Sequence, residues 1–191
     1  METVINTENA VRDVMSGWMT TNLPWRERFW QDMDAMSFMR LNPHWHIHEK
    51  NGAYAIDDIL TDFQFCTDAV LERATGLWSA RFPTIGLTLM ARRGADGNAE
   101  LAYTFRREAG CRLNADRAKS LASYWLPSVR EYFRLFANDS FKNRFWRFVM
   151  NRITLKMTPP QRRICSFIFR LTLLEMVLMV ILGIGFRFYF N

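Results

Sequence analysis

The chain has 191 residues, of which 49% are apolar and 15% aromatic, and its 25 basic and 19 acidic residues give a formal net charge of +6. This composition excludes a globally disordered chain, because disordered chains hold too few apolar residues to form a core. Three cysteines, at positions 66, 111 and 165, argue against a secreted disulfide scaffold and against a cysteine-rich zinc module. The length suits about one ordinary domain.

The N-terminal part of the chain is predicted to form two helices and a hairpin. Helices are expected over residues 9–19 and 24–39, where apolar residues recur at helical spacings. Residues 44–50 alternate between polar and apolar types, which predicts a strand. The pair Asn51-Gly52 is a typical hairpin turn, so a return strand is expected over residues 53–56.

A third helix is expected after Asp57 or Asp58, either of which would cap its start, because apolar residues between 56 and 74 follow a period of 3.6. Gly76 would end this helix. Alternating residues then predict strands over 84–91 and 100–107, joined by a glycine-containing loop.

A long helix is expected next, with Asn114 as its N-cap and Trp125 on its apolar face. Pro127 should kink this helix or begin its second half. The predicted order of elements is α-β-α-β-β-α. We therefore expect residues 1–140 to form an α+β domain with a small, mostly antiparallel sheet packed with helices.

Positive charge is concentrated after this domain. Sixteen basic and 18 acidic residues precede residue 141, whereas residues 141–170 contain eight basic residues and no acidic one. We call these eight residues the basic collar: Lys142, Arg144, Arg147, Arg152, Lys156, Arg162, Arg163 and Arg170.

The collar begins with an amphipathic pattern. Phe141, Phe145 and Phe148 fall on one side of a helical wheel, and Pro159-Pro160 would end the helix. This pattern predicts a juxtamembrane segment, residues 141–163, that lies on a bilayer with anionic headgroups. A plain soluble surface and a nucleic-acid surface are the alternatives, although a basic segment beside a span needs no nucleic acid to explain it.

Residues 171–190 are apolar on all sides and would extend over about 30 Å as a helix, which is the thickness of a bilayer core. We therefore predict a transmembrane helix within residues 164–190. Glu175 is the main objection, because an ionisable group there costs roughly 2–3 kcal/mol on insertion. Arg187 can extend to the far interface. A buried C-terminal helix of a soluble domain is the alternative.

One side of this span carries small and polar residues, namely Thr172, Glu175, Met179 and Gly183. Such residues favour contact between membrane helices, so this side is the predicted contact face for a protein partner in the membrane. Alternatively, Glu175 reaches back to headgroups, or to Arg170 or Arg162.

The collar also predicts orientation, because basic residues beside a span are retained on the cytoplasmic side. The N-terminal residues lack the basic and apolar regions of a secretory signal. We therefore expect a tail-anchored protein of a bacterial inner membrane, with its N-terminal domain in the cytoplasm.

All three histidines of the chain belong to the predicted strand. His44, His46 and His48 would share one face, while Trp45 and Ile47 would point into the core. The outer two Cα atoms would lie about 13 Å apart, whereas metal–nitrogen bonds are about 2 Å long. At most two histidines could therefore bind one ion. A polar surface without metal and a pH-sensitive contact are the alternatives.

The sequence contains none of the usual motifs for a nucleophilic serine, a phosphate-binding loop, a dinucleotide fold or a zinc protease. Cys66, on a predicted helix, is expected to be a buried structural thiol. No cofactor is therefore expected.

The leading hypothesis is a non-enzymatic inner-membrane protein whose cytoplasmic domain and span bind a protein partner. This build is compatible with an immunity, entry-exclusion, defence or secretion-accessory role. One alternative is a membrane-tethered, metal-dependent enzyme that uses the histidine strand. Another is a membrane-bound nucleic-acid binder that uses the collar. A homo-oligomer is also compatible with the sequence.

Overall fold

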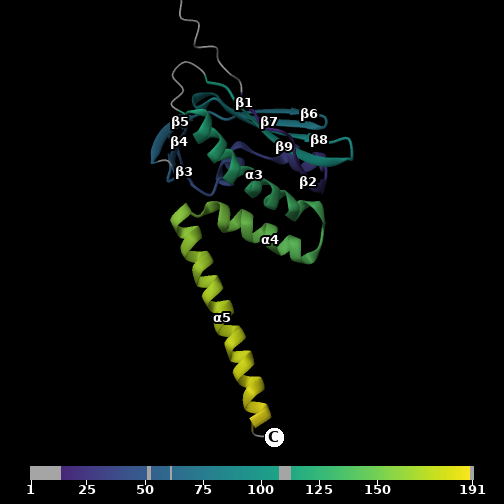
Figure 1. The fold of residues 1–191 in the computed structure, drawn as a ribbon, viewed down its shortest axis with the longest axis vertical. Helices are drawn as coiled ribbons and strands as arrows, with labels where there is room; N and C mark the ends of the chain where they lie inside the picture. Colours follow the sequence, from purple (N-terminus) through teal and green to yellow (C-terminus); the bar gives the residue numbers. More distant parts are fainter. Residues whose placement is uncertain (1–13, 51–52, 61, 108–112, 190–191) are drawn as a thin grey trace, which may run out of the picture.

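The computed structural model describes residues 14–50, 53–60, 62–107 and 113–189, which form an α+β fold, as the sequence predicts (Figure 1). The elements are β1 (Val14–Met15), β2 (Met19–Pro24), α1 (Glu27–Asp32), α2 (Ala35–Arg40), β3 (Trp45–Lys50), β4 (Ala53–Asp58), β5 (Phe63–Thr67), β6 (Val70–Ala74), β7 (Leu77–Phe82), η1 (Pro83–Ile85), β8 (Leu87–Arg93), β9 (Asn98–Phe105), α3 (Ala115–Ala137), α4 (Phe141–Arg152), η2 (Thr154–Lys156) and α5 (Pro159–Tyr189).

The strands form two antiparallel sheets. The larger has the order β1-β9-β8-β7-β6, with β2 also paired to β9, and the smaller has the order β3-β4-β5. The two strands predicted over 84–91 and 100–107 correspond to β8 and β9, which pair with each other. The predicted hairpin is formed by β3 and β4, although its turn, Asn51-Gly52, lies outside the described residues.

The hydrophobic core lies between the sheets and α3. Asn114 caps α3 as predicted, because its side chain accepts a hydrogen bond from a backbone N–H three residues later at 2.9 Å. Trp125, in the middle of α3, is fully buried, and its ring centroid lies 5.0 Å from Phe38 and 4.5 Å from Trp45. Its indole N–H donates to the Phe38 carbonyl at 3.1 Å. Pro127 lies within α3 and does not end it.

The first two predicted helices need correction. The described part of the segment 9–19 is not helical, because β1 and β2 pair with β9 there and tertiary pairing overrides weak helix propensity. The helix predicted over 24–39 is divided into α1 and α2. Met33 is extended between them, and Asp34 caps α2 by accepting a hydrogen bond from the Ser37 N–H at 2.8 Å.

The helix predicted after Asp57 or Asp58 is wrong, because β4, β5 and β6 occupy that segment. Both aspartates lie in β4, and the buried Asp58 carboxylate accepts a hydrogen bond from the Leu60 N–H at 2.9 Å, which forms a turn and not a helix cap. Phe63 and Phe65 alternate with exposed polar residues. The apolar residues of this segment therefore satisfy a period of two as well as 3.6, and sheet pairing decides between them.

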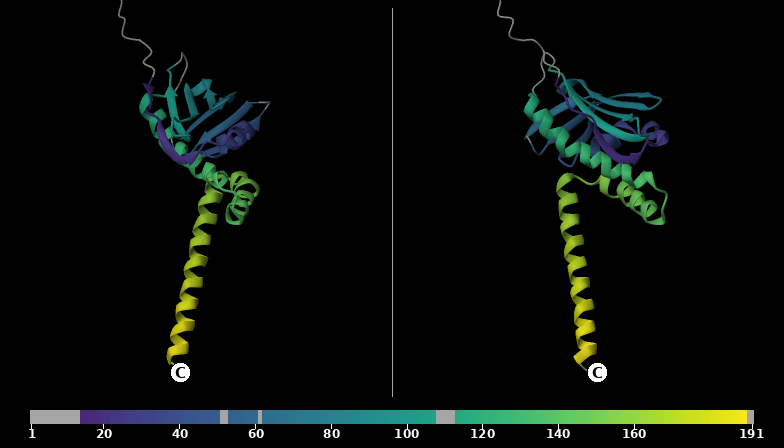
Figure 2. Two further views of the ribbon diagram at one scale, coloured as in Figure 1. Left: turned by 90° about the vertical axis from the view of Figure 1, so that its right-hand side faces the viewer. Right: turned by 45° about the vertical axis from the view of Figure 1, so that its right-hand side comes forward.

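Helices α4 and α5 follow the α+β domain and lie at its lower end in Figure 1. α4 runs beneath α3, and α5 projects away from the domain as one helix (Figures 1 and 2). Pro159 and Pro160 open α5, a position that suits proline because the first helical N–H groups need no partner within the helix. Residues 159–163, which the sequence assigns to the juxtamembrane segment, therefore share one helix with the predicted span.

Candidate membrane interface

α5 is long and apolar enough to cross a membrane over Pro159–Phe186, and none of its most apolar stretch is buried against the described chain. Every side chain from Arg163 to Phe186 is exposed. A core helix of a soluble domain would be covered on every side by other elements. The alternative of a buried C-terminal helix is therefore wrong for the described structure.

The predicted contact face of the span is uncovered. Glu175, Met179 and Gly183 are exposed, and a Cβ atom added to Gly183 would meet no atom within 4 Å. The Thr172 hydroxyl donates to the Ile168 carbonyl at 3.1 Å, so its hydrogen bond is made within α5. This face is therefore accessible to another helix along its whole length.

α4 packs on the domain through a polar contact. The Tyr132 hydroxyl, on α3, donates to the Asn151 side-chain oxygen at 2.7 Å. Burial raises the pKa of Tyr132 above its usual value, although the hydrogen bond to Asn151 opposes this shift. Ser140 caps α4 by accepting a hydrogen bond from the Asn143 N–H at 3.2 Å. No residue of α4 itself is buried.

Two residues of the basic collar bind an aspartate. Arg144 donates two hydrogen bonds to the Asp139 carboxylate, at 2.8 and 3.3 Å, and Arg147 donates a further one. The Arg144 bonds, followed by the Arg147 bond, hold the pKa of Asp139 well below its usual range. The Arg147 guanidinium also lies 5.3 Å from the centre of the Phe136 ring. These two arginines therefore secure the start of α4.

The prediction of a lipid contact requires the Arg162 side chain to point to the solvent, but in the structure it points to the domain. Its guanidinium donates to the carbonyl oxygens of Arg40 at 2.8 Å, Thr154 at 2.9 Å and Met157 at 3.1 Å. These carbonyls come from the end of α2 and from the connection between α4 and α5. We call this arrangement the Arg162 clamp, and it joins the first turn of α5 to the domain.

The other five residues of the collar are exposed. Within the described residues, these side chains form no ion pair with an acidic group: Lys142, Arg152, Lys156, Arg163 and Arg170. Their charge is therefore available to an anionic partner.

The three histidines are divided. The rings of His46 and His48 lie side by side on β3, with centroids 4.1 Å apart. His44 precedes β3, and its ring packs edge-on against Tyr124 of α3 at 5.0 Å. Burial lowers the pKa of His44, Asp58 opposes this shift, and Arg163 adds to it. No group of three or more His, Cys, Asp or Glu side chains in the described part of the chain is placed to hold a metal ion.

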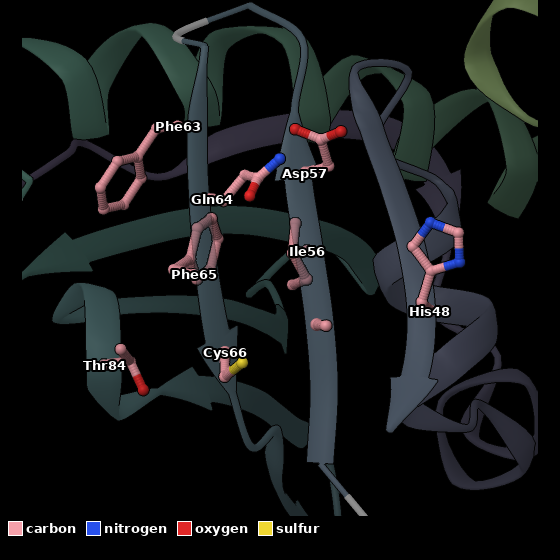
Figure 3. A pocket seen from close by; sticks show the side chains of 9 residues that line it. His48, Ile56, Asp57, Phe63, Gln64, Phe65, Cys66 and Thr84 are labelled. Carbon is pink, nitrogen blue, oxygen red and sulfur yellow. The ribbon is translucent and has the colours of Figure 1, made fainter. Parts of the chain in front are cut away.

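A hollow of about 570 Å³ lies over β4 and β5, and the sequence does not indicate it because that segment is predicted to be helical. His48 and Cys66 both contribute to it, from β3 and β5, with β4 between them (Figure 3). Each of them pairs with Ala55 of β4, so their Cα atoms are two strand spacings apart, about 9.6 Å. Cys66 is exposed, contrary to the buried thiol that the sequence predicts.

No protein-family model matches this chain, and no curated protein matches it significantly.

Proposed function

We propose that this protein is a non-enzymatic, membrane-anchored binding protein. α5 crosses the membrane, the α+β domain faces the cytoplasm, and the domain and the contact face of α5 together recognise a protein partner. The observation that carries the proposal is the uncovered apolar surface of α5 over residues 163–186. A helix of that composition in water would expose far more apolar surface than soluble monomers expose.

The orientation follows from charge. Arg163 and Arg170 lie at the domain end of α5, and the exposed Lys142, Arg152 and Lys156 lie in the segment before it. Positive residues beside a span are retained on the cytoplasmic side. An inner membrane of a bacterium suits this arrangement, and immunity, entry-exclusion, defence and secretion-accessory roles are the candidate contexts.

The histidine-based enzyme is the weaker proposal. Only His46 and His48 lie together, and His44 packs against Tyr124 at a separate place. A metal ion bound by two imidazoles needs at least two further ligands from other residues.

The hollow over β4 and β5 is the proposed surface for a partner, because it combines phenylalanine side chains with exposed polar groups.

Fractionation of cells that express the full chain tests the anchor. We expect the protein in the membrane fraction, resistant to extraction with alkaline carbonate. Release by carbonate, or recovery in the soluble fraction without detergent, would contradict a spanning α5.

Cys66 provides the test of orientation, because its side chain is exposed on β5 of the domain. In a variant that keeps Cys66 and carries Cys111→Ser and Cys165→Ser, a membrane-impermeant maleimide should label inside-out vesicles and spare intact spheroplasts. Labelling of the intact spheroplasts would reverse the proposed orientation while leaving the anchor in place.

A further inference from the structure

We propose that α4 is a second membrane contact, which inserts its phenylalanine side chains into the headgroup region of an anionic leaflet beside α5. This inference rests on the proposed crossing of the membrane by α5. The proposed occupant of the exposed side of α4 is lipid, and not a protein or a nucleic acid.

The first observation is an uncovered aromatic face. The side chains of Phe141, Phe145 and Phe148 are 89%, 55% and 59% exposed. Their spacings of four and three residues place them on one side of α4, which we call the phenylalanine face. An amphipathic helix with such a face buries it at the boundary between headgroups and acyl chains.

The second observation is charge. Arg152 follows Phe148 by four residues and so lies on the same side of α4, and Lys142 directly follows Phe141. Residues 140–174 contain no acidic residue. The nearby carboxylate of Asp139 is already bound by Arg144 and Arg147. The surface therefore presents positive charge that attracts anionic lipid and no free negative charge that would repel it.

The third observation is the arrangement of the two helices. α4 runs obliquely to α5 at the base of the domain, and its first turn lies farther toward the C-terminal end of α5 than its last turn does (Figure 1). With α5 spanning the bilayer, α4 would slope into the leaflet with its first turn foremost. Phe141, in that first turn, is the most exposed of the three phenylalanines and would enter the lipid first.

The depth of α5 is consistent with this contact. Exposed apolar side chains on α5 begin at Ile164, which is 60% exposed, and continue with Phe167 at 67%. Residues 164–186 would extend over about 34 Å, enough to cross a hydrocarbon core of about 30 Å with a modest tilt. The lipid surface would then lie near the start of α5, at the level of α4. Arg170 would lie within the leaflet and extend its guanidinium to the headgroups.

The test uses the full chain in vesicles, with its three native cysteines replaced by serine and one environment-sensitive fluorophore attached to a new cysteine. The three attachment variants are Phe141→Cys, Leu178→Cys as the reporter of the span, and Asp116→Cys as a control at the far end of α3. Vesicles contain phosphatidylcholine with or without phosphatidylglycerol, and spin-labelled lipids quench fluorophores at defined depths.

We expect the label at position 141 to shift to shorter wavelength and to be quenched by shallow spin labels, more strongly with phosphatidylglycerol. The label at 178 should be quenched by deep spin labels, and the label at 116 by neither. A label at 141 that stays in water while the label at 178 is buried overturns the inference and leaves the proposed anchor intact. A label at 178 that is not buried overturns both. Intermolecular crosslinking through position 141 in vesicles, without quenching of the label by shallow spin labels, assigns the face to a second copy or another protein, and also overturns the inference.

Charge variants provide the second measurement. The double variant Lys142→Gln with Arg152→Gln should reduce the ratio of inserted to water-exposed label at position 141 about fivefold per removed charge in anionic vesicles. The matched control, Arg117→Gln with Lys119→Gln on the exposed start of α3, should leave this ratio unchanged. Equal effects of the two double variants would contradict a specific contact of α4 with lipid.

Discussion

Arg162 illustrates how one side chain can be assigned to the wrong partner by its charge. Its guanidinium has five N–H donors in a plane, and this geometry suits several carbonyl oxygens as well as it suits a phosphate. In the fold it donates to carbonyls of Arg40, Thr154 and Met157. Arg162 is therefore a structural residue at the joint between α5 and the domain.

We expect Arg162→Gln to lower the free energy of unfolding by roughly 1.5–3 kcal/mol, because hydrogen bonds made by a charged donor are lost and carbonyls are left without partners. Urea denaturation in detergent, monitored by tryptophan fluorescence, measures this change in the free energy of unfolding. The matched control is Arg163→Gln at the exposed neighbouring position, where a change within about 0.5 kcal/mol is expected. Equal losses in the two variants would show that the clamp contributes nothing specific.

The lowered pKa of His44 should make the free energy of unfolding depend on pH. Burial lowers its pKa in the folded state, so the unfolded chain binds a proton more readily. The stability that results is fully present above the ordinary histidine pKa of about 6.5 and is lost as pH falls through the lower folded value. The facing groups are Tyr124, Asp58 and Arg163, of which Asp58 opposes the shift.

We therefore expect the protein to become less stable between pH 7 and pH 5, and His44→Gln to reduce this dependence. Denaturation midpoints at several pH values measure the effect, and His46→Gln is the control from the neighbouring pair. An unchanged pH profile in His44→Gln would assign the dependence to another group.

Glu175 tests whether α5 does more than anchor. Glu175→Leu removes an insertion cost of roughly 2–3 kcal/mol, so membrane insertion should be retained or improved. Partner binding should weaken, because a group that pairs with the carboxylate would lose its partner at membrane depth. Crosslinking of the partner in cells, with fractionation as the control, measures both.

Glu175→Gln separates two kinds of contact, because it keeps hydrogen-bonding capacity and removes the charge. Retention of binding in this variant indicates a hydrogen bond, and loss indicates an ion pair. Full partner binding in Glu175→Leu would restrict recognition of the partner to the α+β domain.

At the scale of elements, the positions of the histidines in and just before β3 lead to a prediction about metal binding. Because His46 and His48 alone lie together, the triple variant His44→Gln, His46→Gln and His48→Gln should change partner binding or nothing, and no stoichiometric metal should be present. Elemental analysis of the purified full chain measures the metal content. One tightly bound transition-metal ion per chain that is lost in the triple variant would promote the enzyme hypothesis.

The elements differ in how far local sequence determines them. α3, β8 and β9 could be predicted because each has one consistent period and clear end signals, such as Asn114. β5 and β6 could not, because their apolar residues satisfy two periods and the choice depends on strands that pair with them. β2 likewise depends on pairing with β9, which lies far along the chain.

The candidate site shows the same division. The apolar length of α5 and the charge of the collar are properties of composition and could be predicted from sequence alone. The partners of individual charges could not, because the Arg162 clamp requires the carbonyl of Arg40, 122 residues earlier. The separation of His44 from His46 similarly depends on Tyr124, which α3 brings against it.

At the scale of the whole molecule, a fragment of residues 1–163 tests the two proposed membrane contacts separately. It keeps the Arg162 clamp and loses the apolar part of α5. We expect it to remain folded and to be soluble, and to bind vesicles only when they contain anionic lipid, with release by salt. Flotation of the fragment with vesicles at low and high salt measures this. A fragment ending at residue 158 lacks the clamp and should be less stable, as urea denaturation would show.

If α5 crosses the membrane as proposed, its attachment to the domain through the Arg162 clamp would give this helix a mechanical role. With 31 residues, α5 is about 46 Å long, and the Arg162 clamp prevents it from pivoting freely where it meets the domain. Membrane helices adjust to a thinner bilayer by tilting. Because the joint is stiff, the domain would tilt together with the helix. One side of the domain would then move toward the lipid, and the opposite side would move away from it. The accessibility of surfaces such as the hollow over β4 and β5 would then report the thickness of the surrounding bilayer.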